Sequence, residues 1–496
     1  MFNIRDYGAK ADKTTNDAPA IQAAIDACHA AGGGTVHVPA GDYRCGMIRL
    51  RSHVTLELGA GATLWTSTNP ADYELTQRTS QEGYLLQADG AEHVAIVGQG
   101  TLRGEGNWPL GRFFGVPEKP PFRVGILLFT GCRQVTIRDI TILYGDAWTL
   151  HLKRCERVVI DGITIHNDIR HINSDGIDPN SCRDVRISNC HIVAGDDCIV
   201  LKATDPERYP CENVVVTNCT LETTCTAIKL GTESWGDFRD IHFSNCTIRN
   251  TSVGIGFYLK DGATMERMTF SNISIENLDL NHTKHAVFPI YMDIERRDPD
   301  SKVGAIRDIS FSDIQIHGGS GTLIQGMPER PIENLALRNV TMRVETTASW
   351  DQREKAIGGR RTTSDARDTL YARKPSYFTI AHVRGLTLDG VRAIIAKDAY
   401  GYYPRSAVGV YESDGAVIRD VRRVPAGAGS TVPVLELHNC QQMMVTGCLA
   451  ARGTPVFVGV SGEFSRDISL AGNDLRAAAE PVRRTVDTCD DVVCSL

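Results

Sequence analysis

The sequence predicts an all-β fold, a parallel β-helix in which a single chain winds through stacked coils of short strands. Three observations support this prediction. A short alternating motif recurs along most of the chain, its copies are spaced by the length of one coil, and an amphipathic helix precedes them. Because each coil needs only its neighbours to bury its apolar face, we expect one domain over residues 1–496.

Residues 1–45 are predicted to cap the open end of the solenoid. The segment APAIQAAIDACHAA follows Asp17 and is followed in turn by the glycines Gly32 to Gly34. We therefore expect a helix with Asp17 as its N-cap and the glycines as its end. End coils need such a cover because their core and edges would otherwise face water. The apolar residues at helical spacing are Ile21, Ala24, Ile25 and Cys28.

The coils are marked by the motif apolar-x-apolar-x followed by Asn, Asp or Gly. Copies include VRISN at 185–189, VVVTN at 214–218 and IHFSN at 241–245. The alternation turns every second side chain inward, and the fifth residue suits a bend because Asn, Asp and Gly tolerate left-handed backbone angles. Between Asp139 and Asn272 the fifth positions are 23, 27, 29, 27 and 27 residues apart. This spacing fits one coil of a β-helix.

The repeat is interrupted by two long loop insertions, at about 276–305 and about 343–380. The second stretch is polar and contains glycines, so we expect a long loop over one face, where it would shape a binding site. Three cysteines, Cys190, Cys219 and Cys246, share one position of the repeat. Because their spacing matches the coil and no CxxC pair accompanies them, we expect an interior column of packed thiols and no metal site.

Composition and charge exclude several classes of partner. The chain has 53 basic and 60 acidic residues, a formal net charge of -7, whereas nucleic acids and anionic membranes select a basic face. No window of about 18 uninterrupted apolar residues predicts a membrane span. The N-terminus has no apolar segment after a basic one, which predicts a cytoplasmic protein, or a secreted or periplasmic one if a leader precedes residue 1. The oligomeric state stays open.

The densest chemistry lies in two short motifs, NSDGID at 173–178 and GDD at 195–197. Asp175 and Asp196 are 21 residues apart, about one coil, so we expect Asp175, Asp196 and Asp197 to share one face on adjacent coils. Like charges at this distance raise the proton affinity of one carboxyl and leave an acid beside ionised bases. Glycoside hydrolysis needs this combination. Either motif alone is also typical of an ordinary turn.

The two motifs resemble glycoside hydrolase family 28, the polygalacturonases and their relatives, as does the opening segment FNIRDYGAKADKTTNDAPAIQAAIDACHAAGGGTVHVPAGDY. The resemblance covers about residues 1–320. It implies a right-handed parallel β-helix and inverting hydrolysis of galacturonate-containing polymers. It further implies that Asp196 is the general acid and that Asp175 and Asp197 activate the water.

Further site residues follow from the resemblance and its departures. Asn173 and Asp178 match the same motif and would orient the substrate or the aspartates. Where the family has Gly-His-Gly, this chain reads Thr224-Cys225-Thr226, and we place Thr226 at the position of the histidine. Where the family has Arg-Ile-Lys, it reads Tyr258-Leu259-Lys260, so a bidentate clamp is replaced by a ring and a point charge. These changes predict a substrate other than plain homogalacturonan.

Three lysines, Lys202, Lys229 and Lys260, recur on successive coils at nearly the same phase, with Glu233 as a counter-charge. They predict either a basic column that binds an anionic sugar or a set of solvated outer lysines. Tyr258 is a candidate to stack on a sugar ring.

The sequence therefore favours an inverting glycoside hydrolase that acts on galacturonate- or rhamnogalacturonan-derived pectic oligosaccharides, with exo-action and without metal or cofactor. Two alternatives remain at this point. A lyase or epimerase on the same scaffold would remove the proton beside a uronate carboxylate, and a non-catalytic β-helix would only bind carbohydrate.

Overall fold

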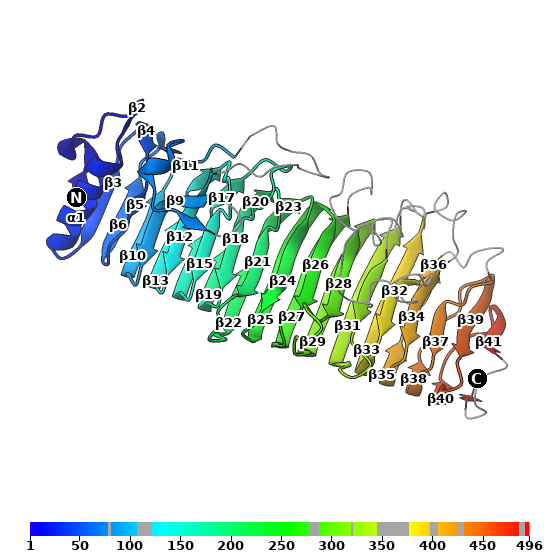
Figure 1. The fold of residues 1–496 in the computed structure, drawn as a ribbon. Helices are drawn as coiled ribbons and strands as arrows, with labels where there is room; N and C mark the ends of the chain where they lie inside the picture. The colour runs from blue at the N-terminus through cyan, green and yellow to red at the C-terminus, as the bar shows by residue number, and fades with distance from the viewer. Residues whose placement is uncertain are drawn as a thin grey trace. The chain divides into compact units, whose positions relative to one another are not determined.

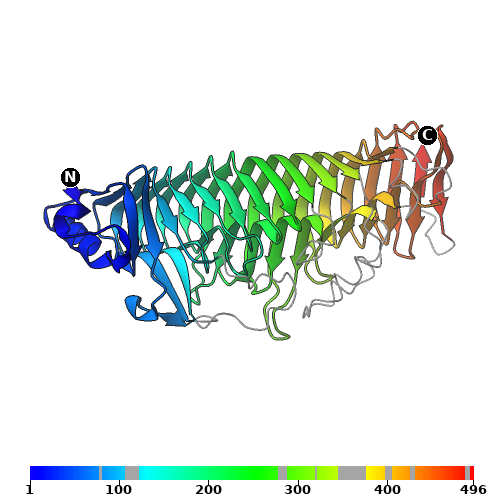
Figure 2. The ribbon, with the colours of Figure 1, turned by 90° about the horizontal axis from the view of Figure 1, so that it is seen from above.

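The computed structural model describes residues 1–77, 81–106, 122–277, 287–318, 321–344, 376–396, 405–424, 431–485 and 492–495. The chain forms two compact units, Met1–Lys229 and Leu230–Leu496. Figures 1 and 2 colour the chain from its N-terminus to its C-terminus. Each unit is described by itself.

The first unit is built from three parallel ladders of strands, and each coil gives one strand to each ladder. The first ladder contains β1 (Phe2–Asn3), β3 (Gly34–Val38), β6 (Val54–Leu58), β10 (Glu92–Gly98), β13 (Arg133–Arg138), β16 (Glu156–Asp161), β19 (Arg183–Ser188) and β22 (Cys211–Thr217). The second contains β2 (Asp12–Asn16), β4 (Gly41–Cys45), β7 (Ala62–Thr66), β11 (Thr101–Arg103), β14 (Thr141–Leu143), β17 (Thr164–His166), β20 (His191–Ala194) and β23 (Thr220–Thr223). The third contains β5 (Ile48–Arg49), β9 (Gln81–Asp89), β12 (Phe122–Thr130), β15 (Leu150–Lys153), β18 (Ile177–Asn180) and β21 (Ile199–Ala203). Beside β9 lies the antiparallel β8 (Thr76–Gln77).

The second unit continues the same pattern with longer strands, many of which run through a bend. One ladder contains β25 (Phe238–Thr251), β27 (Thr264–Asn277), β29 (Ala305–Gly318), β31 (Ile332–Val344), β33 (Val383–Ile395), β35 (Asp414–Arg419), β36 (Arg422–Val424), β38 (Gln441–Thr446), β40 (Arg466–Ala471) and β42 (Val492–Ser495). The other contains β26 (Val253–Leu259), β28 (Phe288–Ile294), β30 (Thr322–Gln325), β32 (Ser376–Ala381), β34 (Ser406–Tyr411), β37 (Leu435–His438), β39 (Thr454–Ser461) and β41 (Ala478–Arg484). The strand β24 (Thr226–Ser234) begins in the first unit and ends in the second.

This architecture is the right-handed parallel β-helix that the repeat and the resemblance predict. The registers join equivalent motif positions, for example Val158 with Val185 and Val185 with Val214. The fifth residues adopt the expected left-handed angles, with φ of 57° at Asn189 and 56° at Asn218. Their amides also link coils, because Asn189 Nδ2 donates to Asp161 Oδ1 at 2.7 Å and Asn218 Nδ2 to Asn189 Oδ1 at 3.3 Å.

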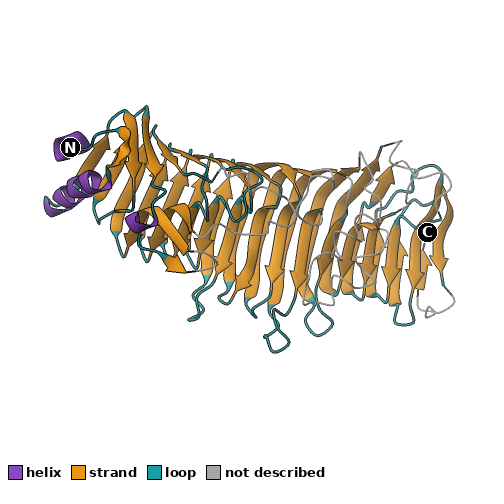
Figure 3. Ribbon diagram, turned by 45° about the horizontal axis from the view of Figure 1, so that its top comes forward, coloured by secondary structure: helices purple, strands orange, loops and turns teal. Residues whose placement is uncertain are grey.

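The N-terminal helix α1 (Ala18–Ala30) forms as expected and packs on β1, β3, β5 and β6. It is the purple helix at the N-terminal end in Figure 3, where the short helices η1 (Ile4–Tyr7) and η2 (Pro70–Asp72) also appear. The prediction that the Asp17 side chain caps it was wrong. Asp17 has helical backbone angles, φ -82° and ψ -4°, so its carboxylate turns away and accepts from the backbone N–H groups of Lys10 at 2.7 Å and Ala11 at 3.0 Å. The buried face is formed by Ala18, Ile21, Ala24, Ile25 and Cys28.

The interruptions of the repeat are only partly described. Most of 343–380 lies outside the described residues, and so does part of 276–305. The described part of 276–305 contains the end of β27 and all of β28, so it is less of a loop than predicted. Cys190, Cys219 and Cys246 form no disulfide and each residue is 2% exposed, which confirms their packing role. None of the helices in the described ranges is long and apolar enough to cross a membrane.

Candidate active site

The three aspartates lie in the first unit, where two successive coils enter the third ladder. Asp175 precedes β18, and Asp196 and Asp197 precede β21. The register joins Ile177 to Ile199, and the backbone N–H of Gly176 donates to the carbonyl of Asp197 at 2.9 Å. Asp175 therefore lies level with Asp197 on the next coil, as the spacing of the two motifs predicts.

The glycines of the two motifs allow these coils to approach closely. A Cβ added to Gly195 would lie 2.2 Å from the carbonyl oxygen of His171, and one added to Gly176 would lie 2.4 Å from the carbonyl oxygen of Cys198. No real Cβ tolerates such contacts with backbone, so both positions need glycine. The glycines that mark these motifs as turns are thus also the residues that bring the carboxyl groups together.

The carboxyl groups are buried to different extents. Asp196 is 9% exposed, Asp175 3% and Asp197 1%. Burial, followed by the negative charges of Asp196 and Asp197, raises the pKa of Asp175 to about 8. Within the described residues, Asp175 Oδ1 and Asp197 Oδ1 have no hydrogen-bond partner. At neutral pH this cluster retains a proton, and Asp175 holds it.

Lysines compensate part of the negative charge. Lys229 Nζ lies 2.6 Å from Asp197 Oδ2 and forms an ion pair with it. Lys202 is 4% exposed, and its Nζ lies 4.7 Å from the centre of the Trp148 ring. Both lysines lower the pKa of Asp175, although less than burial raises it. Lys202 and Lys229 are therefore not the solvated outer lysines of the alternative interpretation.

Asn173 contributes its backbone to the site. Its N–H donates to Asp196 Oδ2 at 3.1 Å, and its φ of 52° is left-handed. The Thr223 hydroxyl donates to the carbonyl oxygen of Asp196. The Asn173 N–H thus fixes one oxygen of the Asp196 carboxyl group, and Thr223 fixes the Asp196 backbone.

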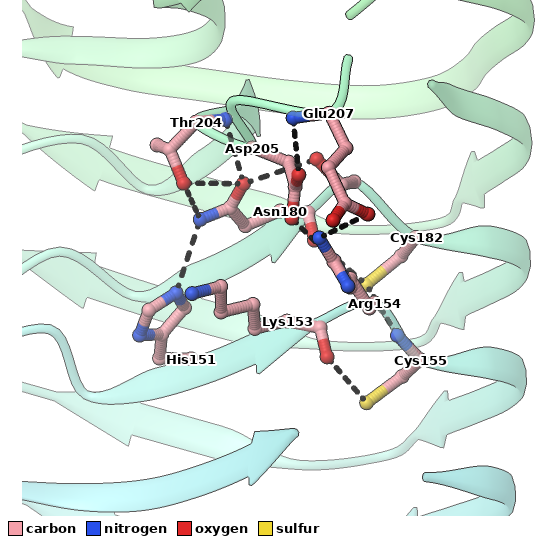
Figure 4. Close-up of polar contacts among 10 residues, drawn as sticks. His151, Lys153, Arg154, Cys155, Asn180, Cys182, Thr204, Asp205 and Glu207 are labelled. Carbon is pink, nitrogen blue, oxygen red and sulfur yellow. Dashed lines mark hydrogen bonds and ion pairs between the residues drawn. The ribbon is translucent and has the colours of Figure 1, made fainter. Parts of the chain in front are cut away.

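Asp178 and its neighbours extend the site along the third ladder. Asp178 is fully buried in β18 and pairs in register with His151 of β15. Figure 4 shows the adjacent network, in which Asn180 Nδ2 donates to Thr204 Oγ1 at 2.8 Å and contacts His151 Nε2 at 3.3 Å. In the same view Arg154 pairs with Asp205 and with Glu207, which ties the segment after β21 to β15.

The remaining predicted site residues belong to the second unit. Lys260 forms an ion pair with the buried Glu295. The Tyr258 ring packs 4.9 Å from the Tyr291 ring and is 6% exposed. Glu233 is half-buried, and its charge helps to raise the pKa of Arg297, whose main partner is Asp261. Substrate binding by Glu233, Tyr258 and Lys260 stays a prediction.

Sequence reasoning missed one residue that touches the acidic cluster. Cys225 Sγ and carboxylate oxygens of Asp196 and Asp197 lie within 4.8 Å of one another. Cys225 therefore lies beside the aspartates, and the carbonyl oxygen of the neighbouring Thr226 accepts from the backbone N–H of Cys198 at 3.1 Å. A thiolate with two carboxylates is a ligand set that zinc accepts, but the Lys229 ammonium already occupies Asp197. We accordingly still expect a metal-free site.

A second missed group holds the loop that carries Asp175. Asn167 Nδ2 donates to the carbonyl oxygen of Ser174 at 3.0 Å, and Asn167 Oδ1 accepts from the backbone N–H of Gly145 at 2.8 Å. The fully buried Arg123 and the buried His171 contact the same loop. No motif surrounds these residues. The one available signal was a lone arginine directly before the apolar run VGILLF.

Comparison with known proteins adds a family to this geometry. The model for "Glycosyl hydrolases family 28" matches residues 28–353. A "Probable polygalacturonase" of Vitis vinifera is 28% identical over 262 residues, which cover 48% of this chain and 53% of that protein. An "Exo-poly-alpha-D-galacturonosidase" of Dickeya chrysanthemi is 29% identical over 252 residues, 40% of this chain and 41% of that protein. The alignments thus span about half of each relative or less.

A solved structure supports the fold alone. The Yersinia enterocolitica family 28 exopolygalacturonase superposes with a TM-score of 0.60 at 20% identity, over 83% of this chain and 78% of that one. A mannuronan C5-epimerase of Azotobacter vinelandii is 50% identical over 116 residues, but these cover only 22% of this chain and 6% of that protein.

Proposed function

The chain belongs to glycosyl hydrolases family 28, and on this basis we propose that it hydrolyses glycosidic bonds of pectic oligosaccharides that contain galacturonate or are derived from rhamnogalacturonan. We further propose exo-action, which the Dickeya chrysanthemi relative supports by its description as an exo-acting galacturonosidase.

The observation that carries this proposal is the division of protonation within the acidic cluster. Asp197 forms an ion pair with Lys229, while the raised pKa of Asp175 keeps one proton in the cluster near neutral pH. An acid and a base next to each other are what glycosidic cleavage requires. The titration belongs to the cluster as a whole, because the three carboxyl groups interact strongly.

We assign the roles as follows. Asp196 is the general acid, because it is the most exposed of the three and matches the acid of the family motif. Asp197, which forms an ion pair with Lys229, activates the water together with Asp175. On this assignment, the proton held by Asp175 in the free protein passes to Asp196 when the substrate binds.

The anomeric configuration of the product provides the most discriminating test of the mechanism. Family membership supports inversion. However, oxygens of Asp196 and Asp197 lie within 4.8 Å, closer than the about 6.5–9.5 Å usual between the acid and the base of inverting glycosidases. Proton NMR that identifies the anomer formed first would decide between inversion and retention. A product that retains the configuration of the anomeric carbon would reject inversion.

Product analysis tests the reaction class. Defined oligogalacturonates and rhamnogalacturonan oligosaccharides should release saturated monosaccharides from one end, and Asp196→Asn should lower kcat by about 10³-fold or more without a change in Tm. Internal fragments would reject exo-action, and full turnover by Asp196→Asn would reject the assigned acid.

The lyase or epimerase alternative has a specific observation in its favour, the local similarity to the mannuronan C5-epimerase. A lyase would release an unsaturated uronide that absorbs in the near ultraviolet, and an epimerase would change the sugar without cleaving the chain. Neither product is expected here, because the similarity covers so little of either protein.

A further inference from the structure

A buried arginine joins two successive coils directly behind the acidic cluster. Arg123, at the start of β12, is fully buried. Its Nε donates to the carbonyl oxygen of Asp146 at 2.6 Å, and its Nη2 donates to the carbonyl oxygen of Ile172 at 2.5 Å. Its Nη1 donates to Asn173 Oδ1 at 3.3 Å. One guanidinium thus contacts the bend after β14 and the loop before β18.

The partners of Arg123 are themselves held in place. The Asp146 carboxylate oxygen Oδ1 lies 4.0 Å from Arg123 Nε and 2.7 Å from His171 Nε2. His171 and Asp146 are 2% and 6% exposed, so this network is closed to solvent. A buried charge without compensation would be costly, and here the arginine and the aspartate compensate each other.

The network ends at the proposed general acid. The residue whose side chain receives Arg123 Nη1 is Asn173, and the backbone N–H of Asn173 donates to Asp196 Oδ2 at 3.1 Å. Arg123 therefore acts on the loop that orients the Asn173 N–H toward Asp196.

We propose that Arg123 is a positioning residue for Asp196, which through Ile172 and Asn173 fixes the orientation of the carboxyl group that protonates the leaving oxygen. The inference rests on the proposed function. The planar fork of arginine suits this task, because it donates in three directions at fixed angles, whereas a lysine ammonium is a point charge on a flexible stem.

A double-mutant cycle tests this proposal on oligogalacturonate hydrolysis. Arg123→Lys should lower kcat by roughly 10- to 100-fold with KM nearly unchanged, since a displacement of about 1 Å at a reacting group costs this much. In the Asp196→Asn background the same change should cost no more than about 2-fold, because the group that Arg123 positions is already gone. Arg133→Lys, at a half-exposed arginine of β13, is the control and should leave kcat unchanged.

The outcomes separate the two proposals. If Arg123→Lys costs the same factor in both backgrounds, or nothing in the wild type, the positioning role is overturned. If the wild type releases no saturated sugar from any of the pectic oligosaccharides, the proposed function fails instead, and full turnover by Asp196→Asn rejects the assigned acid.

A second variant allows the test even if Arg123→Lys prevents folding. If Arg123→Lys lowers the Tm strongly, Asn173→Gly replaces it in the cycle, since glycine accepts the φ of 52° and keeps the N–H while removing the acceptor of Nη1. Asn173→Gly should show the same non-additivity with Asp196→Asn, and equal losses in both backgrounds would again overturn the role.

Discussion

At the scale of single residues, the three aspartates differ only in what surrounds them. Asp197 has an ammonium at 2.6 Å, Asp196 a backbone N–H at 3.1 Å, and Asp175 has burial and two negative neighbours. Three identical side chains thereby differ in their surroundings: Asp197 is ion-paired, Asp196 is hydrogen-bonded to the backbone, and Asp175 has a raised pKa. Such a split is typical of sites that perform acid and base catalysis with carboxyl groups.

The raised pKa of Asp175 predicts a pH-dependent cost in stability. The pKa of the Asp175 carboxyl is near 3.8 in the unfolded chain and about 8 in the folded protein. Between these values the folded state holds a proton that the unfolded chain has lost, so this group lowers the stability as the pH rises from about 4 to about 8. Asp175→Asn should therefore raise the free energy of unfolding by about 1–2 kcal/mol at pH 8 and hardly at pH 4, while it abolishes activity. Thermal unfolding at both pH values measures this, and an equal gain at both would contradict it.

The ion pair of Lys229 predicts a loss of both stability and activity. The Lys229 side chain is 16% exposed and that of Asp197 2%. Removing the ammonium in Lys229→Met leaves a buried carboxylate without its partner, which costs on the order of 3 kcal/mol and disturbs the proposed base. The free energy of unfolding, measured by denaturant titration, and kcat should both fall. Lys10→Met, at an exposed lysine, should change neither quantity. Unchanged stability in Lys229→Met would show that the pair is not formed.

At the scale of elements, the site depends on how closely two coils approach. The loops before β18 and β21 lie against each other through the backbone, and Gly195 faces the carbonyl oxygens of His171 and Asp168. The offset of 22 residues that joins Ile177 to Ile199 also brings these two loops together.

The contact at Gly195 predicts a sharp effect of one methyl group. Gly195→Ala should push the loop 171–174 away, with a loss of about 1–3 kcal/mol in stability and a fall in kcat. The control is Gly90→Asn, at an open position with φ 59° that asparagine tolerates, and it should change neither property. Circular dichroism melts and kcat measure both variants. A neutral Gly195→Ala would mean that the two coils are further apart.

At the scale of the whole molecule, we predict an acidic site that requires no metal. Because Lys229 neutralises Asp197, we predict that activity survives EDTA unchanged in an assay of oligosaccharide hydrolysis. A loss of activity that added Zn²⁺ or Ca²⁺ restores would show that Asp196, Asp197 and Cys225 do hold an ion.

Much of the fold was predictable because a solenoid converts sequence spacing directly into position. The alternation of side chains predicted the strands, the fifth residues predicted the left-handed bends, and the interval from Asp175 to Asp196 predicted adjacent coils. The cap helix followed from its own periodicity. The Asp17 cap did not, because the segment at Lys10 and Ala11 competes for its carboxylate.

The sequence by itself thus determined the coil, the helix and which aspartates meet. Only the tertiary structure decided which aspartate has a raised pKa, that Cys225 lies beside the aspartates, and that Arg123 holds the loop behind Asp196. The physical reason is that spacing along the chain is a local property, whereas burial and hydrogen bonding of a side chain depend on residues from other coils. For Arg123 and Asn173 those partners are separated by 50 residues in sequence, and no pattern in the chain marks their meeting.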